Sequence, residues 1–132
     1  MTVVLQDLVM LRGDSLPFLL TCTQTTPDGV TGPLDLTGAT LWMTAKKRLT
    51  DPDSAAVFQI KTPTDIAIDA DPTTGKAVIT VPAAATVDLK FDEKTGRIDL
   101  HYDIQVKTSN GVVQTLRKGL LHVDIDVTQA VV

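Results

Sequence analysis

The fold is decided by a stretch in the second half of the chain, which reads Asp99-Leu100-His101-Tyr102-Asp103-Ile104-Gln105-Val106-Lys107, then Thr108-Ser109-Asn110-Gly111, and returns through Gly119-Leu120-Leu121-His122-Val123-Asp124-Ile125-Asp126-Val127-Thr128. Apolar and polar residues alternate on both sides of the turn, which is the period of a half-buried strand. Asn110-Gly111 predicts a type I′ turn, because both central residues of that turn need positive φ. The stretch therefore predicts a β-hairpin.

A two-residue loop at Asn110-Gly111 also predicts the register of this hairpin. It sets Leu100 opposite Leu121, Ile98 opposite Val123, Tyr102 opposite Gly119, and Asp103 opposite Lys118. The ring of Tyr102 can then cover the bare Gly119. A slip of one residue would set Tyr102 against Lys118 and turn an apolar face to water. Turn chemistry and hydrophobic pattern thus predict one register.

Shorter strand-like segments fill the rest of the chain. They span residues 5–11, 17–25, 39–46, 55–62, 65–69 and 76–81, and turn residues such as Thr26-Pro27-Asp28-Gly29 separate them. Residues 82–89 alone have local helical tendency, over at most two turns. About eight short strands with turn signals every ten residues or so are typical of a two-layer antiparallel sandwich. We expect residues 1–132 to form one such domain.

Composition excludes several classes of function. The 132 residues carry a formal net charge of -4, which argues against a nucleic-acid surface. No apolar run approaches membrane-spanning length, so we expect no membrane association, and the N-terminus lacks the basic start of a signal peptide. The single cysteine, Cys22, is in phase with Phe18 and Leu20, which predicts a small core residue rather than a reactive thiol.

A cluster of polar residues on the returning strand is the best candidate for a cation site. His122, Asp124 and Asp126 share one face, Asp99 falls opposite His122, and His101 lies two residues along. Imidazole and carboxylates at this spacing can hold a divalent cation. Alternating polar residues are also what a solvated sheet face shows, and we favour that interpretation, with no metal.

No constellation of acid, base and nucleophile stands out. Ser15 follows Gly13-Asp14 without a nucleophile elbow, and Asp69-Ala70-Asp71 lacks the glycine and the glutamate of a calcium loop. Gly75-Lys76 lacks the rest of a phosphate loop. We therefore expect no enzyme activity, no catalytic residues and no cofactor.

Partner contacts are expected at the chain ends and at the sole tryptophan. Both ends are apolar, so residues 1–6 and 129–132 are expected to pair with a neighbouring copy or another protein. Trp42 lies on the more polar face of its strand, where it is either a lid over the sandwich edge or a partner contact. The expected contact residues are Trp42, Val3, Val4, Leu5, Val131 and Val132.

Several segments together resemble a known family. They are Arg12-Gly13-Asp14-Ser15, Pro33-Leu34-Asp35-Leu36-Thr37-Gly38-Ala39, Tyr102-Asp103-Ile104-Gln105, and Gly119 with Val123-Asp124-Ile125-Asp126-Val127-Thr128. In order and spacing, residues 7–128 resemble small structural proteins of tailed bacteriophages and prophages. They are similar to the immunoglobulin-like N-terminal domain of phage upper baseplate proteins, which anchors receptor-binding machinery to the virion. The larger relatives continue into a linker or helical region, so this chain resembles the anchoring module alone.

The resemblance implies an all-β, immunoglobulin-like antiparallel β-sandwich and a non-enzymatic virion structural protein, made in the cytoplasm of the bacterial host. Tail or baseplate attachment is the leading expectation, and capsid decoration or head-fibre attachment is the alternative. The expected partners are other phage structural proteins and copies of the same chain. A carbohydrate-binding module with Trp42 as its platform is a further alternative. Because the chain has only five aromatic residues (Trp 1, Tyr 1, Phe 3), a stacking surface is hard to build and a glycan partner is not favoured.

Overall fold

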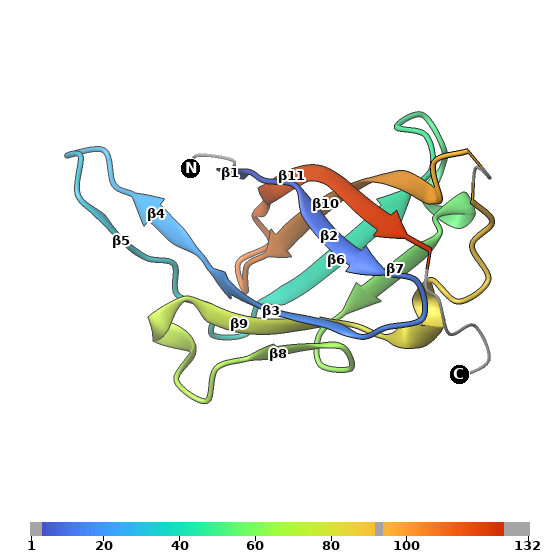
Figure 1. The fold of residues 1–132 in the computed structure, drawn as a ribbon. Helices are drawn as coiled ribbons and strands as arrows, with labels where there is room; N and C mark the ends of the chain where they lie inside the picture. The colour runs from blue at the N-terminus through green and yellow to red at the C-terminus, as the bar shows by residue number, and fades with distance from the viewer. Residues whose placement is uncertain (1–3, 92–93, 126–132) are drawn as a thin grey trace.

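The larger of the two main sheets contains the predicted hairpin. The structure is a computed structural model, and it describes residues 4–91 and 94–125 (Figure 1). Within these residues the larger sheet has six strands in the order β1-β11-β10-β6-β7, and β2 also lies beside β11. Its strands are β1 (Val4–Leu5), β2 (Leu8–Leu11), β6 (Thr40–Lys46), β7 (Phe58–Lys61), β10 (Arg97–Lys107) and β11 (Val113–Asp124).

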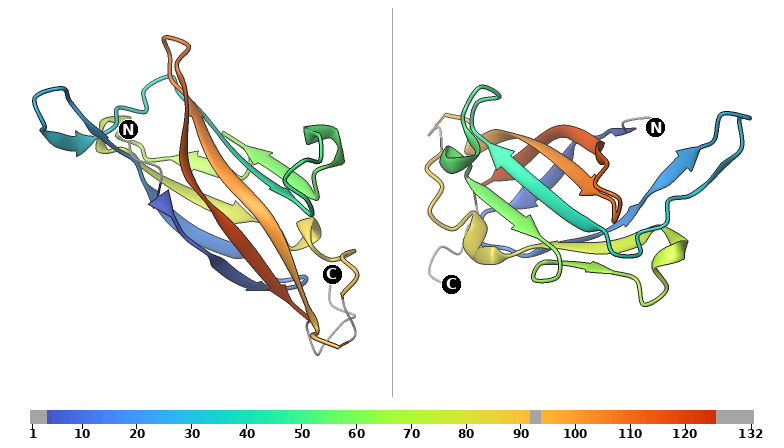
Figure 2. Two further views of the ribbon diagram at one scale, coloured as in Figure 1. Left: turned by 90° about the horizontal axis from the view of Figure 1, so that it is seen from above. Right: turned by 180° about the vertical axis from the view of Figure 1, so that it is seen from behind.

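The smaller sheet packs against the larger one and completes a two-layer sandwich (Figure 2). Its order is β3-β9-β8, with β3 at Leu16–Thr21, β8 at Ile66–Ile68 and β9 at Lys76–Val81. This division of strands between the sheets is that of an immunoglobulin-like sandwich, in which strands B, E and D form one sheet and strands C, F and G the other. The predicted all-β sandwich is confirmed.

Helical structure is limited to single turns. The described residues hold three short 3-10 helices, η1 (Asp53–Ala55), η2 (Pro72–Thr74) and η3 (Ala83–Ala85). Only η3 lies in the segment 82–89, where helical tendency was predicted. Because η1 occupies the start of the predicted strand 55–62, the strand itself begins later, at Phe58.

The predicted register of the long hairpin is confirmed, although its predicted turn is wrong. Leu100 pairs with Leu121, Ile98 with Val123, Tyr102 with Gly119, and Asp103 with Lys118. The loop, however, has three residues, which lie between Thr108 and Val112. The Thr108 N–H donates a hydrogen bond to the Val112 C=O at 2.9 Å. Gly111 has φ +88°, and no described residue other than glycine has positive φ, so Asn110 does not form a type I′ turn.

A bulge explains how a different turn leads to the same register. The three-residue loop shifts the pairing near the tip by one residue, so that Gln105 faces Thr115. An irregularity between Ile104 and Gln105 then restores the predicted pairing, because Ile104 faces Arg117. An extra residue on one strand absorbs such a shift. Beyond Leu116, the apolar face of β11 therefore still points into the core.

The first strands run parallel to the last one, a departure from the antiparallel arrangement expected of the whole sandwich. Val4 lies opposite Arg117 in β11, and Leu8 lies opposite Leu121. Between them the chain crosses over Gly119, where an added Cβ would lie 2.2 Å from the backbone oxygen of Gln6. Glycine is therefore required at position 119 for the two strands to approach. The Tyr102 hydroxyl donates to the same Gln6 oxygen at 2.5 Å.

A second hairpin, which we call the arm, projects from one end of the sandwich (Figures 1 and 2). It consists of β4 (Thr23–Thr25) and β5 (Thr31–Pro33), which pair only with each other. The sequence analysis assigned residues 17–25 to one strand and predicted the turn at Thr26-Pro27-Asp28-Gly29, but it assigned no strand after the turn. The arm is thus an element that the sequence analysis missed.

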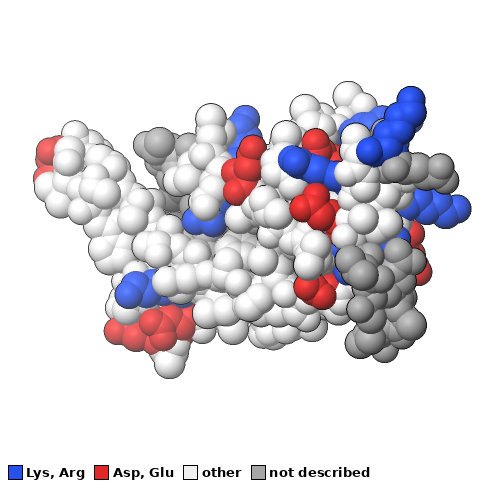
Figure 3. Space-filling model, in the orientation of Figure 1, with Lys and Arg blue, Asp and Glu red and all other residues white. Residues whose placement is uncertain are grey.

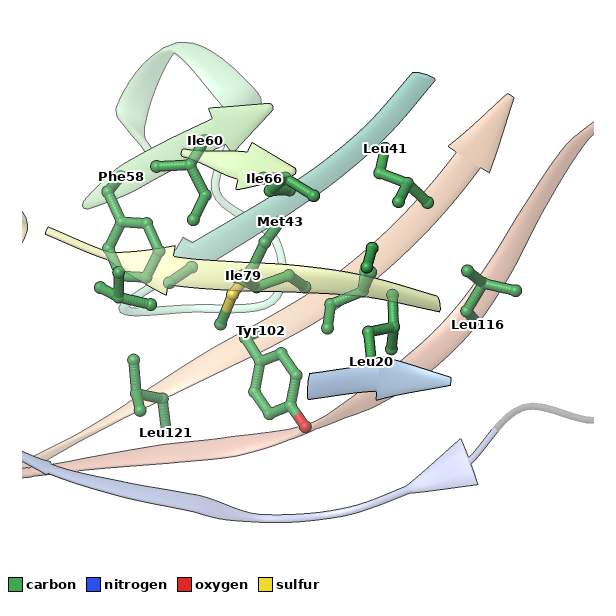
Figure 4. Packing of buried hydrophobic residues seen from close by; sticks show 14 of the residues in the cluster. Leu20, Leu41, Met43, Phe58, Ile60, Ile66, Ile79, Tyr102, Leu116 and Leu121 are labelled. Atoms are coloured by element: carbon green, nitrogen blue, oxygen red, sulfur yellow. The ribbon is translucent and has the colours of Figure 1, made fainter. Parts of the chain in front are cut away.

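The core fills the space between the two sheets (Figure 4). Side chains that alternate along the strands point into it and are almost completely buried. They include Leu20, Leu41, Met43, Ile66, Ile79, Leu100, Ile104, Leu121 and Val123. Cys22 is buried among them, as predicted. Burial raises the pKa of its thiol to about 11, which leaves it protonated and unreactive at neutral pH.

Candidate functional site

The outward face of the larger sheet is hollowed into an open groove of about 1030 Å³. Its lining comes from five strands, because β6, β7, β10, β11 and β1 each contribute at least one side chain. The lining residues include Trp42, Lys46, Gln59, Asp103, Gln105 and Lys118. Ligand sites in proteins commonly measure about 300–1,000 Å³. The groove is therefore large enough for a ligand of several rings.

Alternation along the strands decides which residues reach the groove. On β6, Leu41, Met43 and Ala45 are buried, and the intervening Trp42 and Lys46 are half-buried and line the groove. On β10 the same alternation brings Asp103 and Gln105 to the groove while Ile104 stays in the core. The sequence pattern thus predicts the outward face of each strand, and the order of the strands brings these faces together.

Trp42 lies between two polar cross-strand neighbours, Gln105 on β10 and Lys61 on β7. In antibody domains, a tryptophan on strand C packs in the core against a disulfide. In the sheet order C-F-G, strand C takes the place of β6. Here Trp42 faces outward, and Cys22 is the only cysteine of the chain. Of the two interpretations left open for Trp42, a contact residue agrees better with this position, because it lines the groove rather than covering the edge of the sandwich.

Asp103 is a half-buried charged group of the groove. Burial raises the pKa of its carboxyl, an effect that nearby Lys46 opposes and Asp53 reinforces. Lys46 forms its ion pair with Asp53, at 2.8 Å between Nζ and Oδ1, rather than with Asp103. Across the strands, Asp103 faces Lys118 and Thr44. Within residues 4–91 and 94–125, no hydrogen bond or ion pair is formed by its side chain.

Apolar residues stand around the polar floor of the groove. Leu5 on β1 and Leu49 in the loop after β6 both line it, and they are 73% and 75% exposed. Leu120 on β11 also contributes to the lining. Isolated exposed leucines are common on protein surfaces, but these belong to one concave face. The groove therefore combines a polar floor with apolar sides.

Several residues of the candidate cation cluster form a hydrogen-bonded network with Arg97 and Asp7. His122 lies between two carboxylates, with Nδ1 2.7 Å from Asp99 Oδ1 and Nε2 3.5 Å from Asp7 Oδ2. Arg97 Nε donates to Asp99 Oδ1 at 2.9 Å. Among the described residues, no group of three or more His, Cys, Asp or Glu side chains is placed to hold a metal ion. Asp126, which the sequence analysis placed on the same face as His122 and Asp124, lies outside those residues.

This network connects β10, β11 and the segment between β1 and β2. The His122 and Arg97 side chains hold the pKa of Asp99 below its usual range. The Leu120 N–H donates to Asp7 Oδ1 at 3.0 Å, and this bond is the main cause of the lowered pKa of Asp7. Asp7 thereby ties the segment between β1 and β2 to β11. These residues thus have a structural role in holding the first segment of the chain against the larger sheet.

The terminal residues expected to contact neighbours have mixed outcomes. Val4 and Leu5 form β1, whose partner is β11 of the same chain rather than a neighbouring copy. Leu5 remains exposed and lines the groove. Val3, Val131 and Val132 lie outside the described residues. Residues 4 and 5 are therefore used by the fold, and only one side of β1 remains as a sheet edge.

The arm is exposed along nearly its whole length. From Thr23 to Pro33, every residue is exposed except Gly32, which is half-buried. Its only charged residue, Asp28, lies in the loop at the tip. A Thr–Thr hydrogen bond at 2.9 Å between Thr25 and Thr31 links its two strands. The loop chemistry of residues 26–30 was the signal that could have identified the second strand of this hairpin.

Charge is mixed over the surface in the view of Figure 3. Basic and acidic side chains alternate there, and no broad area of one sign is seen. Nucleic-acid binding usually depends on a continuous basic surface. This face therefore offers no such surface.

No protein-family model matches the sequence, and no curated protein matches it either. In the part of the chain that the structure describes, no helix is both long enough and apolar enough to cross a membrane. The functional argument therefore depends on the fold, the groove and the arm.

Proposed function

We propose that this protein is a non-enzymatic structural protein of a bacteriophage particle and acts as an anchoring module of the tail or baseplate. One observation carries the proposal, namely the arm, which extends from the sandwich and buries no side chain against it. The resemblance described above supplies the phage context. The proposed partners are other phage structural proteins and copies of the same chain, and the proposed location is the virion.

The arm is suited to contact with a partner because it contributes nothing to the core of its own chain. An isolated two-stranded hairpin is at best marginally stable in water. The arm has short strands of three residues each and one sizeable apolar residue, Val30, which is 60% exposed. Its outer strand edges expose backbone groups that can pair with a strand of another chain. Assembly would bury surface that the free chain leaves in water.

Immunogold electron microscopy of purified particles tests the proposal, with an antibody raised against this chain and particles from the source phage or induced prophage. We expect label at the tail tip. Label over the capsid would instead support capsid decoration or head-fibre attachment, the second candidate location on the particle. Unlabelled particles, with the protein present in the lysate and its epitope accessible, would overturn the virion proposal.

An arm-deleted variant tests the role of the arm itself. Thr23 and Pro33 face each other across the base of the hairpin, so residues 24–32 can be replaced by a two-residue Asn-Gly turn. We expect a folded protein, checked by circular dichroism and thermal unfolding, that particles lacking the wild-type chain no longer incorporate. Ala67→Ser, an exposed substitution on the smaller sheet, is the control and should be incorporated normally. Incorporation of the arm-deleted variant would contradict this role.

A further inference from the structure

We propose that the groove on the larger sheet is a binding site for a neutral oligosaccharide, which stacks on Trp42 and donates hydroxyl hydrogen bonds to Asp103. This inference goes beyond the proposed function, because sugar binding by the groove does not depend on where the chain sits on a particle. It also proposes a glycan partner, which the small number of aromatic residues did not favour in the sequence analysis.

Trp42 supplies the apolar surface of the proposed site. It is the only tryptophan of the chain, and it lies half-buried in the groove between the polar neighbours Gln105 and Lys61. The C–H face of a sugar ring is apolar and its rim carries hydroxyls, so it matches an aromatic ring that is surrounded by polar groups. One well-placed ring is enough for one such contact, even in a chain with few aromatic residues.

Asp103 supplies an acceptor that the fold itself leaves unused. Its carboxylate is half-buried in the groove, and no described residue forms a hydrogen bond or ion pair with its side chain. Partial burial without a hydrogen bond makes the charged form of this carboxylate less stable than it is in water. Sugar hydroxyls can donate the missing hydrogen bonds, and bonds to an ionised acceptor are stronger than those between neutral groups. Bound sugar would thus stabilise the carboxylate.

Amide and ammonium groups complete the polar floor. Gln59 Nε2 donates to Thr44 Oγ1 at 3.0 Å, and Gln105 Nε2 lies 3.4 Å from Thr115 Oγ1. Neither contact uses the carbonyl oxygen of its amide, so two acceptors remain for a ligand. Lys118, opposite Asp103, supplies ammonium donors. The groove thus presents donors and acceptors side by side, as a polyhydroxyl ligand requires.

The charges around the groove select against other ligands. Its lining includes Lys46 and Lys118 as well as Asp7, Asp53 and Asp103, so neither sign dominates. Single-stranded nucleic acid is bound in positively charged grooves, which this is not. Most charged residue types are depleted at the centre of protein–protein interfaces, whereas Lys46, Asp103 and Lys118 all line this groove. A neutral, hydroxyl-rich ligand fits this lining better than either macromolecule.

The test is a titration of the purified chain with a panel of neutral oligosaccharides, two to six sugars long, built from glucose, mannose, galactose or N-acetylglucosamine. Trp42 is the only tryptophan, so its fluorescence reports directly on the groove. We expect at least one member of the panel to cause a saturable shift in emission. Absence of a shift, together with absence of binding by calorimetry, would overturn the proposal.

Matched variants locate the binding. Asp103→Asn should weaken the binding of that sugar at least tenfold, and Trp42→Ala should abolish it by calorimetry. Asp28→Asn, the same change at the exposed tip of the arm, should leave affinity unchanged. Unchanged affinity in Asp103→Asn, or an equal loss in Asp28→Asn, would overturn the assignment to the groove. The result is independent of immunogold labelling, so this proposal and the proposed function can fail separately.

Discussion

The arm and the β10–β11 hairpin have loops of the same design but lie in different parts of the fold. Residues 26–30 read Thr-Pro-Asp-Gly-Val, and residues 108–112 read Thr-Ser-Asn-Gly-Val. In each loop the first threonine N–H donates to the C=O of the last valine at 2.9 Å. The glycines have φ values of +84° and +88°. One hairpin nevertheless forms the centre of the larger sheet, whereas the other projects into solvent.

The strands beside the loops account for the difference. Those of the long hairpin alternate apolar and polar residues, and side chains such as Leu100, Ile104 and Leu121 are completely buried. The strands of the arm are Thr-Gln-Thr and Thr-Gly-Pro, which offer no apolar face. The comparison shows that a turn sequence determines that a hairpin forms, but only a strand with an apolar face is held in the core. Four predictions test how residues of the two hairpins contribute to the stability of the fold.

The largest contrast is expected when one apolar residue of each hairpin is shortened. Leu121→Ala removes a fully buried side chain and should lower the free energy of unfolding by about 3 kcal/mol, within the 2–5 kcal/mol typical of such changes. Val30→Ala, at an exposed position, should change it by less than about 0.5 kcal/mol. Urea denaturation measures both. A comparable loss in Val30→Ala would show that the arm is part of the cooperative unit.

The next effect concerns the close contact between the long hairpin and the first strands. In Gly119→Ala, the new Cβ would lie 2.2 Å from the Gln6 oxygen, so the chain before β2 must move away. We expect a loss of about 2 kcal/mol, because overpacking and broken hydrogen bonds each cost about 1 kcal/mol or more. Increased amide exchange at Leu120, whose N–H donates to Asp7, would report the displacement. Wild-type stability would contradict the proposed contact.

The two loop glycines test the same strain in two settings. Both Gly111→Ala and Gly29→Ala place a side chain at positive φ, where an L-residue costs about 1–2 kcal/mol, and neither new Cβ meets an atom of a described residue within 4 Å. In Gly111→Ala we expect the free energy of unfolding to fall by about 1 kcal/mol. In Gly29→Ala the strain should open only the arm and leave the global value unchanged. Equal losses would show that the two hairpins are equally coupled to the core.

The smallest effect is expected at Asp103. Burial raises the pKa of its carboxyl in the folded protein, so folding is favoured while the group is protonated and this contribution is lost as pH rises through the raised pKa. Asp103→Asn should therefore be slightly more stable than wild type at pH 7. The gain should disappear below the pKa of the unfolded chain. Thermal unfolding across this pH range measures the difference, and a less stable variant at pH 7 would contradict it.

The register of the long hairpin shows how far a sequence pattern can be used. The alternation of Leu100, Tyr102 and Ile104 with their partners predicted the pairing correctly, because a slip would expose the apolar face. The type I′ turn at Asn110 was wrong, since a one-residue shift at the loop is absorbed by the irregularity near Ile104. Burial of a whole face outweighs the conformation of a single turn residue.

The candidate site could be predicted only in part. Trp42 was placed from the sequence on the more polar face of its strand, as either a lid over the sandwich edge or a partner contact, and it lines the groove. Asp103 was expected only as a cross-strand neighbour of Lys118, and its role in the groove was missed. Its half-buried position depends on residues of other strands, which alternation within β10 does not reveal. The polar face around His122, favoured from the sequence as a solvated sheet face, contains a network in which His122 contacts Asp7 and Asp99.

The all-β class, the outward and inward faces of the strands and the pairing within the long hairpin could be predicted from the sequence. These features depend on neighbours in the chain and on the two-residue period of a strand. The tertiary structure was needed to place β1 and β2 parallel to β11, to form the groove and to show that the arm projects from the sandwich. The bond from Leu120 to Asp7 joins residues 113 positions apart. Such contacts depend on the packing of whole sheets, which no local pattern specifies.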